Sequence, residues 1–162
     1  MKKICVLLFI FMLISVIFTG CSGSQVTGVK EGTKIDKKDL KIGFVHYSDP
    51  SDQGYTYNHN KATWKMAEEL GIDKSQIINK YNVPDTAQAA TAFRELAEDG
   101  CQIIFSTSHG HEDYLLEVAF EYPSVVFCHF SGVKAKSSGL KNVHNYFGDI
   151  AQVRYLSGVV SG

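Results

Sequence analysis

The segment after the first apolar run of the mature chain carries side chains suited to binding a small molecule. The run Ile42–Tyr47 is β-branched and aromatic, and the loop after it holds Asp49, Asp52, Tyr55 and Tyr57. Aromatic faces can stack on a flat ligand, and carboxylates can accept hydrogen bonds from its amine or hydroxyl groups. A buried strand leading into such a loop is where open α/β sheets bind ligands. We therefore predict a ligand site here.

A second group of residues that could take part in chemistry is the segment 109–113, His-Gly-His-Glu-Asp, which follows another apolar strand. H-x-H-x-D resembles the ligand pattern of metallo-β-lactamase-like hydrolases, in which two imidazoles hold zinc and the aspartate takes a second metal. Tyr114 stands where that pattern continues with another His, and the neighbouring elements alternate strand and helix. We therefore predict no metal, no cofactor and no enzymatic activity. A metal-dependent hydrolase using His109, His111 and Asp113 remains the alternative.

The elements that position these groups alternate along the chain. The hydrophobic patterning predicts strands over Leu40–Tyr47, Gln76–Tyr81, Gln102–Thr107, Val125–Phe130 and Val143–Phe147. Helices are predicted over Tyr57–Leu70, Thr86–Glu98 and Glu112–Tyr122, and again from Asp149. Strands separated by helices of this length indicate βαβ units. The predicted fold class is therefore α/β, one doubly wound parallel sheet.

Two details of the helices are also predicted. Ala62, Met66, Ala67 and Leu70 form the apolar face of the first helix, and Gly71 ends it. Asp85 precedes the second helix with Gln88 three residues later, so we expect Asp85 to cap that helix.

The first residues predict a lipoprotein. Lys2 and Lys3 precede the fifteen-residue run Ile4–Phe18, which is short for a membrane span but suits a signal peptide. Thr19 and Gly20 then precede Cys21, an arrangement typical of a lipidation site. An ordinary membrane anchor or a plain secretory signal is the alternative. We predict a signal peptide over 1–20, a flexible tether over 21–38 that begins at lipidated Cys21, and a folded domain over 39–162 on the outer face of the cell membrane.

Composition and charge limit the partners. The formal net charge is −1, and without Lys2 and Lys3 the chain has 14 basic against 17 acidic residues, a charge of −3. No basic surplus remains to favour nucleic acid. Cys101 begins one predicted strand and Cys128 lies midway along the next, so we expect two buried thiols rather than a disulfide.

Five segments resemble one protein family in order and spacing. They are Gly54–His59, GYTYNH; Ile103–Asp113, IIFSTSHGHED; Tyr122–Gly132 with its FCHFSG; Tyr146–Gly148, YFG; and Gln152–Gly158, QVRYLSG. They resemble the basic membrane protein, or PnrA-like, family of bacterial substrate-binding lipoproteins. Tyr55 stands where the purine-binding subgroup usually has Trp. The resemblance runs from Lys41 to Gly162.

The resemblance implies a site and a ligand. The ligand would be a purine base or nucleoside, and Tyr55 would be the aromatic residue that stacks on it. Asp52 and Tyr57 would lie in the same loop, and Ser108 and His109, which follow the predicted strand Gln102–Thr107, would meet the ligand at the same edge of the sheet. His129 and Arg154 match family positions but are expected in structural roles. The resemblance also counts against the hydrolase alternative, because it implies that the histidines of segment 109–113 are sequence variation in a loop of this family.

The resemblance also implies partners and a missing part. The protein would be a type I periplasmic-binding-protein-like lobe serving an ABC importer, with an ABC permease as its partner and the membrane reached through its lipid anchor. Family members have two lobes, so residues 39–162 are expected to be an amino-terminal lobe, from a truncated product or a partial gene. A sensory or regulatory lipoprotein of the same fold is the main alternative function.

Overall fold

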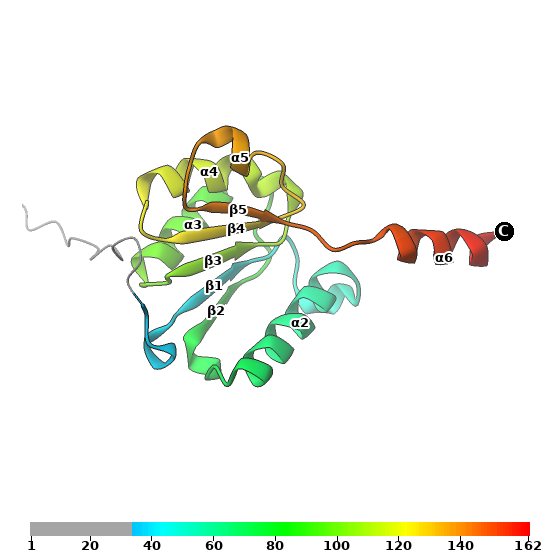
Figure 1. The fold of residues 1–162 in the computed structure, drawn as a ribbon, viewed down its shortest axis with the longest axis horizontal. Helices are drawn as coiled ribbons and strands as arrows, with labels where there is room; N and C mark the ends of the chain where they lie inside the picture. Colours follow the sequence, from blue (N-terminus) through cyan, green and yellow to red (C-terminus); the bar gives the residue numbers. More distant parts are fainter. Residues whose placement is uncertain (1–33) are drawn as a thin grey trace, which may run out of the picture.

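A computed structural model of the chain describes residues 34–162 and contains one parallel sheet of five strands in the order β2-β1-β3-β4-β5 (Figure 1). The strands are β1 Ile42–Val45, β2 Ile77–Lys80, β3 Ile103–Ser106, β4 Val126–Phe130 and β5 Val143–Tyr146. Every neighbouring pair is parallel, with Ile42 aligned to Ile77 on one side and to Ile103 on the other. The predicted α/β fold with a parallel sheet is confirmed.

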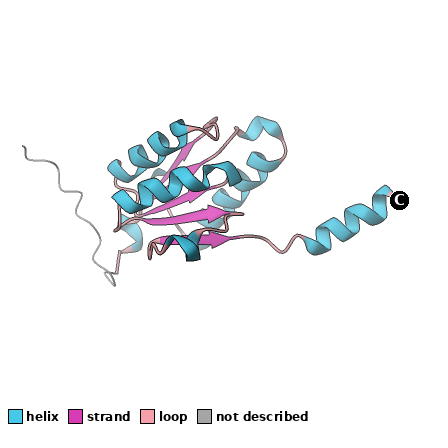
Figure 2. Ribbon diagram, turned by 90° about the horizontal axis from the view of Figure 1, so that it is seen from above, coloured by secondary structure: helices cyan, strands magenta, loops and turns pink. Residues whose placement is uncertain are grey.

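Helices cover both faces of the sheet (Figures 1 and 2). The α-helices are α2 Tyr55–Leu70, α3 Ala87–Glu98, α4 Glu112–Glu121, α5 Ala135–Ser138 and α6 Ala151–Ser161. Short 3-10 helices are η1 Lys37–Asp39, η2 Pro50–Asp52, η3 Lys74–Gln76 and η4 His109–His111. Helix α2 covers one face, whereas α3 and α4 cover the other, and α6 extends away from the sheet after β5.

Two apolar clusters hold these layers together. The larger lies under α3 and α4, where Phe93, Leu96 and Phe127 are fully buried. The smaller lies under α2, where Ile42, Phe44 and Ala67 pack together with Ile72 and Ile77. Burying a side chain as large as Phe or Leu contributes about 1.5–3 kcal/mol each, so these layers fix the strand ends that carry the loops discussed below.

The structure corrects two sequence-based expectations. Ala67 is buried and Met66 packs against the same core, as predicted. Ala62 and Leu70 are exposed on α2, because the helix turns Thr56 and Thr63 toward the sheet instead. Asp85 does not cap α3; the hydroxyl of Thr86 accepts from the Gln88 N–H, and this leaves the Asp85 carboxylate for other contacts. Gly71 does end α2, in a left-handed conformation with φ of 60°.

Expectations for the first residues lie mostly outside the described range. The predicted signal peptide, Cys21 and most of the tether fall there. Within residues 34–162, the helices are too short or too polar to cross a membrane. Cys101 is buried and Cys128 is partly buried, and both are free thiols.

Candidate functional site

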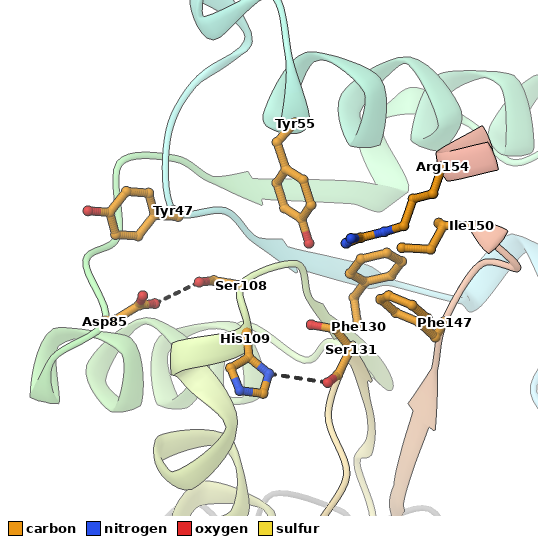
Figure 3. A pocket seen from close by; sticks show the side chains of 10 residues that line it. All are labelled: Tyr47, Tyr55, Asp85, Ser108, His109, Phe130, Ser131, Phe147, Ile150 and Arg154. Carbon is orange, nitrogen blue, oxygen red and sulfur yellow. Dashed lines mark hydrogen bonds between the residues drawn. The ribbon is translucent and has the colours of Figure 1, made fainter. Parts of the chain in front are cut away.

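A pocket of about 580 Å³ lies at the carboxyl edge of the sheet (Figure 3). Loops that follow the strands supply its walls, as expected for a parallel sheet with helices on both faces. The lining residues are Tyr47, Tyr55, Asp85, Ser108, His109, Phe130, Ser131, Phe147, Ile150 and Arg154. They come from segments separated by up to about a hundred residues, so only the folded chain assembles this pocket.

Tyr55 stands at the start of α2 because Asp52 fixes the turn before it. The Asp52 carboxylate accepts hydrogen bonds from the backbone N–H groups of Gly54 at 2.9 Å, Thr56 at 2.7 Å and Tyr57 at 2.9 Å. These bonds, the one from Gly54 foremost, lower the pKa of Asp52 to about 2. A charged carboxylate is also stabilised beside the positive end of the helix dipole. The turn thereby presents the Tyr55 ring to the pocket.

An aromatic cluster forms the apolar wall around Tyr55. Phe130, the last residue of β4, lies with its ring centroid 5.9 Å from that of Tyr55 and 5.2 Å from that of Phe147. His59 lies edge-on to both Tyr55 and Phe130, at 4.6 and 4.7 Å. Burial lowers the pKa of His59 to about 4, so its ring is neutral at pH 7. Tyr55 is still 49% exposed, which leaves aromatic surface available to a ligand.

The opposite wall is polar. Ser108 Oγ donates to Asp85 Oδ1 at 2.7 Å, and His111 Nε2 lies 3.2 Å from the same oxygen. His109 Nδ1 donates to the carbonyl of Ser131 at 3.2 Å. Ser131 has φ of 60°, a strained value for a residue with a side chain, and such strain is typical of functional sites. These polar groups face the aromatic wall across the pocket (Figure 3).

A buried carboxylate behind the pocket holds the loop that carries Ser131. Glu112, only 6% exposed, accepts from the N–H groups of Val133 at 2.6 Å and Lys134 at 2.7 Å. A Cβ atom on Gly132 would lie 2.6 Å from the Glu112 oxygen and 2.2 Å from His129 Nδ1, so the loop needs glycine at this position.

His129 lies in the core beneath the pocket, as expected for a structural histidine. It is fully buried, and its Nε2 donates to the Ser108 carbonyl at 2.8 Å. Its Nδ1 has no hydrogen-bond partner among residues 34–162. Burial lowers the pKa of His129, so the ring is held neutral.

The predicted site residues divide into two groups. Tyr55, Ser108 and His109 line the pocket, whereas Asp52 and Tyr57 do not: Asp52 is occupied by the turn, and Tyr57 is exposed on α2. Sequence reasoning missed Phe130, Phe147 and Asp85 as pocket residues. It also expected a structural role for Arg154, which lines the pocket. A signal for the two phenylalanines existed, because both stand at the carboxyl end of predicted strands.

The residues of the metal-ligand pattern point to different neighbours. His111 is buried, with Nε2 3.0 Å from the Val83 carbonyl and Nδ1 3.2 Å from Ser106 Oγ. Asp113 is exposed and pairs with Lys134. Within the described part of the chain, no three His, Cys, Asp or Glu side chains gather closely enough to hold a metal ion. The geometry gives the hydrolase alternative no support.

Comparisons with known proteins agree with this architecture. Among the structures with a similar fold is an ABC transporter solute-binding protein from Conexibacter woesei, with a TM-score of 0.63, 20% identity, and coverage of 75% of this chain and 39% of that one. A protein from Bacillus halodurans titled a transcriptional activator of the comK gene has a TM-score of 0.52 at 21% identity, over 65% and 33% of the two chains. At these identities the likeness shows the fold alone.

Sequence relatives define the family. A purine-binding protein of Brucella abortus is 34% identical over 122 residues, which cover 75% of this chain and 33% of that protein. A Haloferax volcanii protein named for glucose binding in an ABC transporter is 24% identical over 144 residues, 89% of this chain and 35% of that one. This chain thus spans about a third of the length of these relatives. Residues 39–162 match the family described as ABC transporter substrate-binding protein, PnrA-like. The chain therefore belongs to the PnrA-like family of ABC transporter substrate-binding proteins.

Proposed function

We propose that this chain captures a purine base or nucleoside as part of a lipid-anchored solute-binding protein that serves an ABC importer. The observation that carries the proposal is the pocket itself, in which an aromatic wall of Tyr55, Phe130 and Phe147 faces a polar wall at the carboxyl edge of the sheet. A flat ring with polar edges fits such a site, since small-molecule pockets combine apolar surface with a few placed polar groups. The purine-binding relative supports the same ligand class.

Each residue that the sequence predicted for the site has a role in this proposal. Tyr55 stacks on the purine, which contributes about 1–3 kcal/mol for an aromatic–base contact. Ser108 and His109 meet its polar edge from the loop after β3. Asp52 acts through the turn that positions Tyr55, and Tyr57 contributes to the surface of α2. The site needs no cofactor, and binding rather than catalysis is its function.

Residues 39–162 would supply one lobe of a two-lobed protein, which the coverage of about a third of each curated relative supports. The ligand would then be enclosed between two lobes that close by hinge motion, and the closed form would dock on the permease. A single lobe makes only part of the contacts. A loss of about 4 kcal/mol weakens binding roughly a thousandfold, so we expect this chain alone to bind purines only weakly.

The ligand proposal is tested by titrating the ¹⁵N-labelled full chain, in mild detergent, with adenine, guanine and their nucleosides while recording NMR spectra. We expect saturable shifts at pocket residues. Tyr55→Ala should weaken binding by about 1–3 kcal/mol, and Tyr55→Trp should preserve it. Tyr57→Ala is the matched control, because it removes another exposed tyrosine from the first turn of the same helix. Equal losses from both alanine variants, or none from Tyr55→Ala, would place the ligand elsewhere.

Membrane anchoring is tested separately at Cys21. We expect the chain to incorporate labelled palmitate and to fractionate with membranes, and Cys21→Ala to lose both properties. Cys101→Ala is the control, since that thiol is buried in the folded domain. Labelling and membrane retention that persist in Cys21→Ala would contradict the lipoprotein proposal.

A further inference from the structure

Asp85 is a pocket residue that neither the sequence nor the family motifs indicated. It lies in the connection between β2 and α3, and its carboxylate is 39% exposed on the polar wall of the pocket. Thr86 caps α3 in its place, so the helix does not explain why a carboxylate stands here. A carboxylate that lines a pocket can serve as a hydrogen-bond acceptor for a ligand.

One oxygen of this carboxylate is already occupied. Oδ1 accepts from Ser108 Oγ at 2.7 Å and lies 3.2 Å from His111 Nε2. That nitrogen also lies 3.0 Å from the Val83 carbonyl, which can only accept, so Nε2 must carry the proton. On the other side of the ring, His111 Nδ1 then accepts from Ser106 Oγ at 3.2 Å. That single proton is directed at Val83, so the hydrogen bond that Oδ1 accepts comes from Ser108, and this bond holds the carboxylate in one orientation.

The second oxygen lies against the backbone of Gly110. A Cβ atom on Gly110 would lie 2.4 Å from Asp85 Cγ and 2.5 Å from Oδ2, far inside van der Waals contact. Only glycine at position 110 lets the carboxylate lie where it does. Among residues 34–162, none donates a hydrogen bond to Oδ2, although Oδ1 of the same group accepts one from Ser108. The local structure thus fixes the carboxylate and leaves one oxygen unpaired at the pocket.

We propose that Asp85 determines ligand specificity by accepting, through Oδ2, one hydrogen bond from an N–H or O–H donor of the bound purine or nucleoside. This inference rests on the proposed function. Tyr55 and Phe130 contact the flat face of the ligand, and Asp85 accepts a hydrogen bond from a donor on the ligand's edge. Because Oδ1 is engaged, the site offers a single acceptor rather than the pair of oxygens that a two-pronged contact would need. The donor is either the exocyclic amino group of an aminopurine or a ribose hydroxyl.

Two ligand pairs distinguish these donors. Adenine and 6-methylpurine have similar shapes, but only adenine has the amino group. Adenosine and 2′,3′-dideoxyadenosine differ in the two ribose hydroxyls. Dissociation constants are measured for all four by NMR titration of the full chain in mild detergent. We expect the unmodified chain to favour the donor-bearing member of one pair by about tenfold or more, as for a hydrogen bond to a charged acceptor.

Asp85→Asn should abolish that preference. Ser108 donates to the Oδ1 position, and an NH₂ group there would lie 3.2 Å from the His111 N–H, so the amide oxygen takes this position and the NH₂ group replaces Oδ2 with a donor. Gly110→Ala keeps the charge but displaces the carboxylate, and it should also reduce the preference. Asp99→Asn is the matched control: it removes the same charge from an exposed site outside the pocket and should retain the preference. Thermal melting by circular dichroism establishes that each variant is folded.

The outcomes separate this inference from the proposed function. Binding that depends on Tyr55 but shows the same ligand preference in Asp85→Asn as in the unmodified chain would overturn the role of Asp85 alone. A lack of preference within both pairs in the unmodified chain would do the same. If none of the four ligands binds the unmodified chain, both the proposed function and the role of Asp85 fail.

Discussion

Glu112 offers a direct test of how the pocket loop is held. Its carboxylate is buried at the first turn of α4 and accepts from the N–H groups of Val133 and Lys134. The next residue, Asp113, reaches the same loop but is exposed, and it pairs with the Lys134 ammonium group. Two adjacent carboxylates on one helix therefore hold one loop, the first through buried backbone contacts and the second through a surface ion pair.

The expected effects differ in size. Hydrogen bonds to a charged acceptor contribute about 1.5–3 kcal/mol each and neutral ones about 0.5–1.5 kcal/mol. Glu112→Gln can keep both bonds in neutral form, so we expect it to lower the free energy of unfolding by about 2 kcal/mol. Glu112→Ala removes both and should cost about 3–5 kcal/mol. Asp113→Asn should cost at most about 1 kcal/mol, because exposed ion pairs contribute little.

The measurement is urea unfolding of the full chain and the three variants, followed by circular dichroism. NMR spectra of the folded variants should show the largest shifts around Ser131, which lies on the affected loop. The reasoning is refuted if Asp113→Asn costs as much as Glu112→Ala, or if Glu112→Gln costs less than about 0.5 kcal/mol. A cost confined to Glu112 without changes in the loop would also contradict it.

Three further predictions follow from packing and burial. Gly132→Ala should destabilise the fold by about 1–3 kcal/mol by overpacking the loop, whereas Gly148→Ala, with open space around it, should be nearly neutral in the same unfolding assay. Because burial lowers the pKa of His59 to about 4 from 6.5, the unfolded chain binds more protons between these values. Stability should therefore fall as pH drops from 6.5 to 4, and His59→Gln should flatten the slope by up to about 1.4 kcal/mol per pH unit in unfolding measured across pH. Burial raises the pKa of the Cys101 and Cys128 thiols to about 11. Both thiols should therefore resist alkylation by iodoacetamide at pH 8 until urea unfolds the chain, as followed by peptide mass mapping. Rapid labelling of the folded chain would be inconsistent with that burial.

The sequence predicted the layers of the fold well because local patterns determine them. Each predicted strand contains the observed one and exceeds it by at most two residues at either end, as for Leu40–Tyr47 against Ile42–Val45. The apolar face of α2 was predicted less well. Thr63 is buried there although it is polar, because its hydroxyl donates to the His59 carbonyl within the helix. Hydropathy alone cannot predict the burial of a polar side chain whose hydrogen bond is made within its own helix.

The pocket could be predicted only in part, for a different physical reason. Tyr55 and Ser108 were found because each follows a strand whose carboxyl end must lie at the same edge of the sheet. Asp85 was assigned to a helix cap, since a capping residue is recognisable within four positions of sequence. Its actual partners, Ser108 and His111, lie 23 and 26 residues further along the chain. Contacts between loops depend on how the strands pair, and no local pattern encodes them.

Asp52 links the local fold of the chain to the geometry of the pocket. The sequence suggested it as a ligand contact because it is an acidic residue beside an aromatic one in a binding loop. Its three backbone hydrogen bonds instead make it the residue that orients the start of α2 and therefore the Tyr55 ring. A ring fixed in this way loses little conformational freedom when a ligand stacks on it, which favours binding without any contact between ligand and carboxylate. Glu112 acts similarly on the Ser131 loop and Gly110 on Asp85, so the geometry of the pocket depends on residues that a list of ligand contacts would omit.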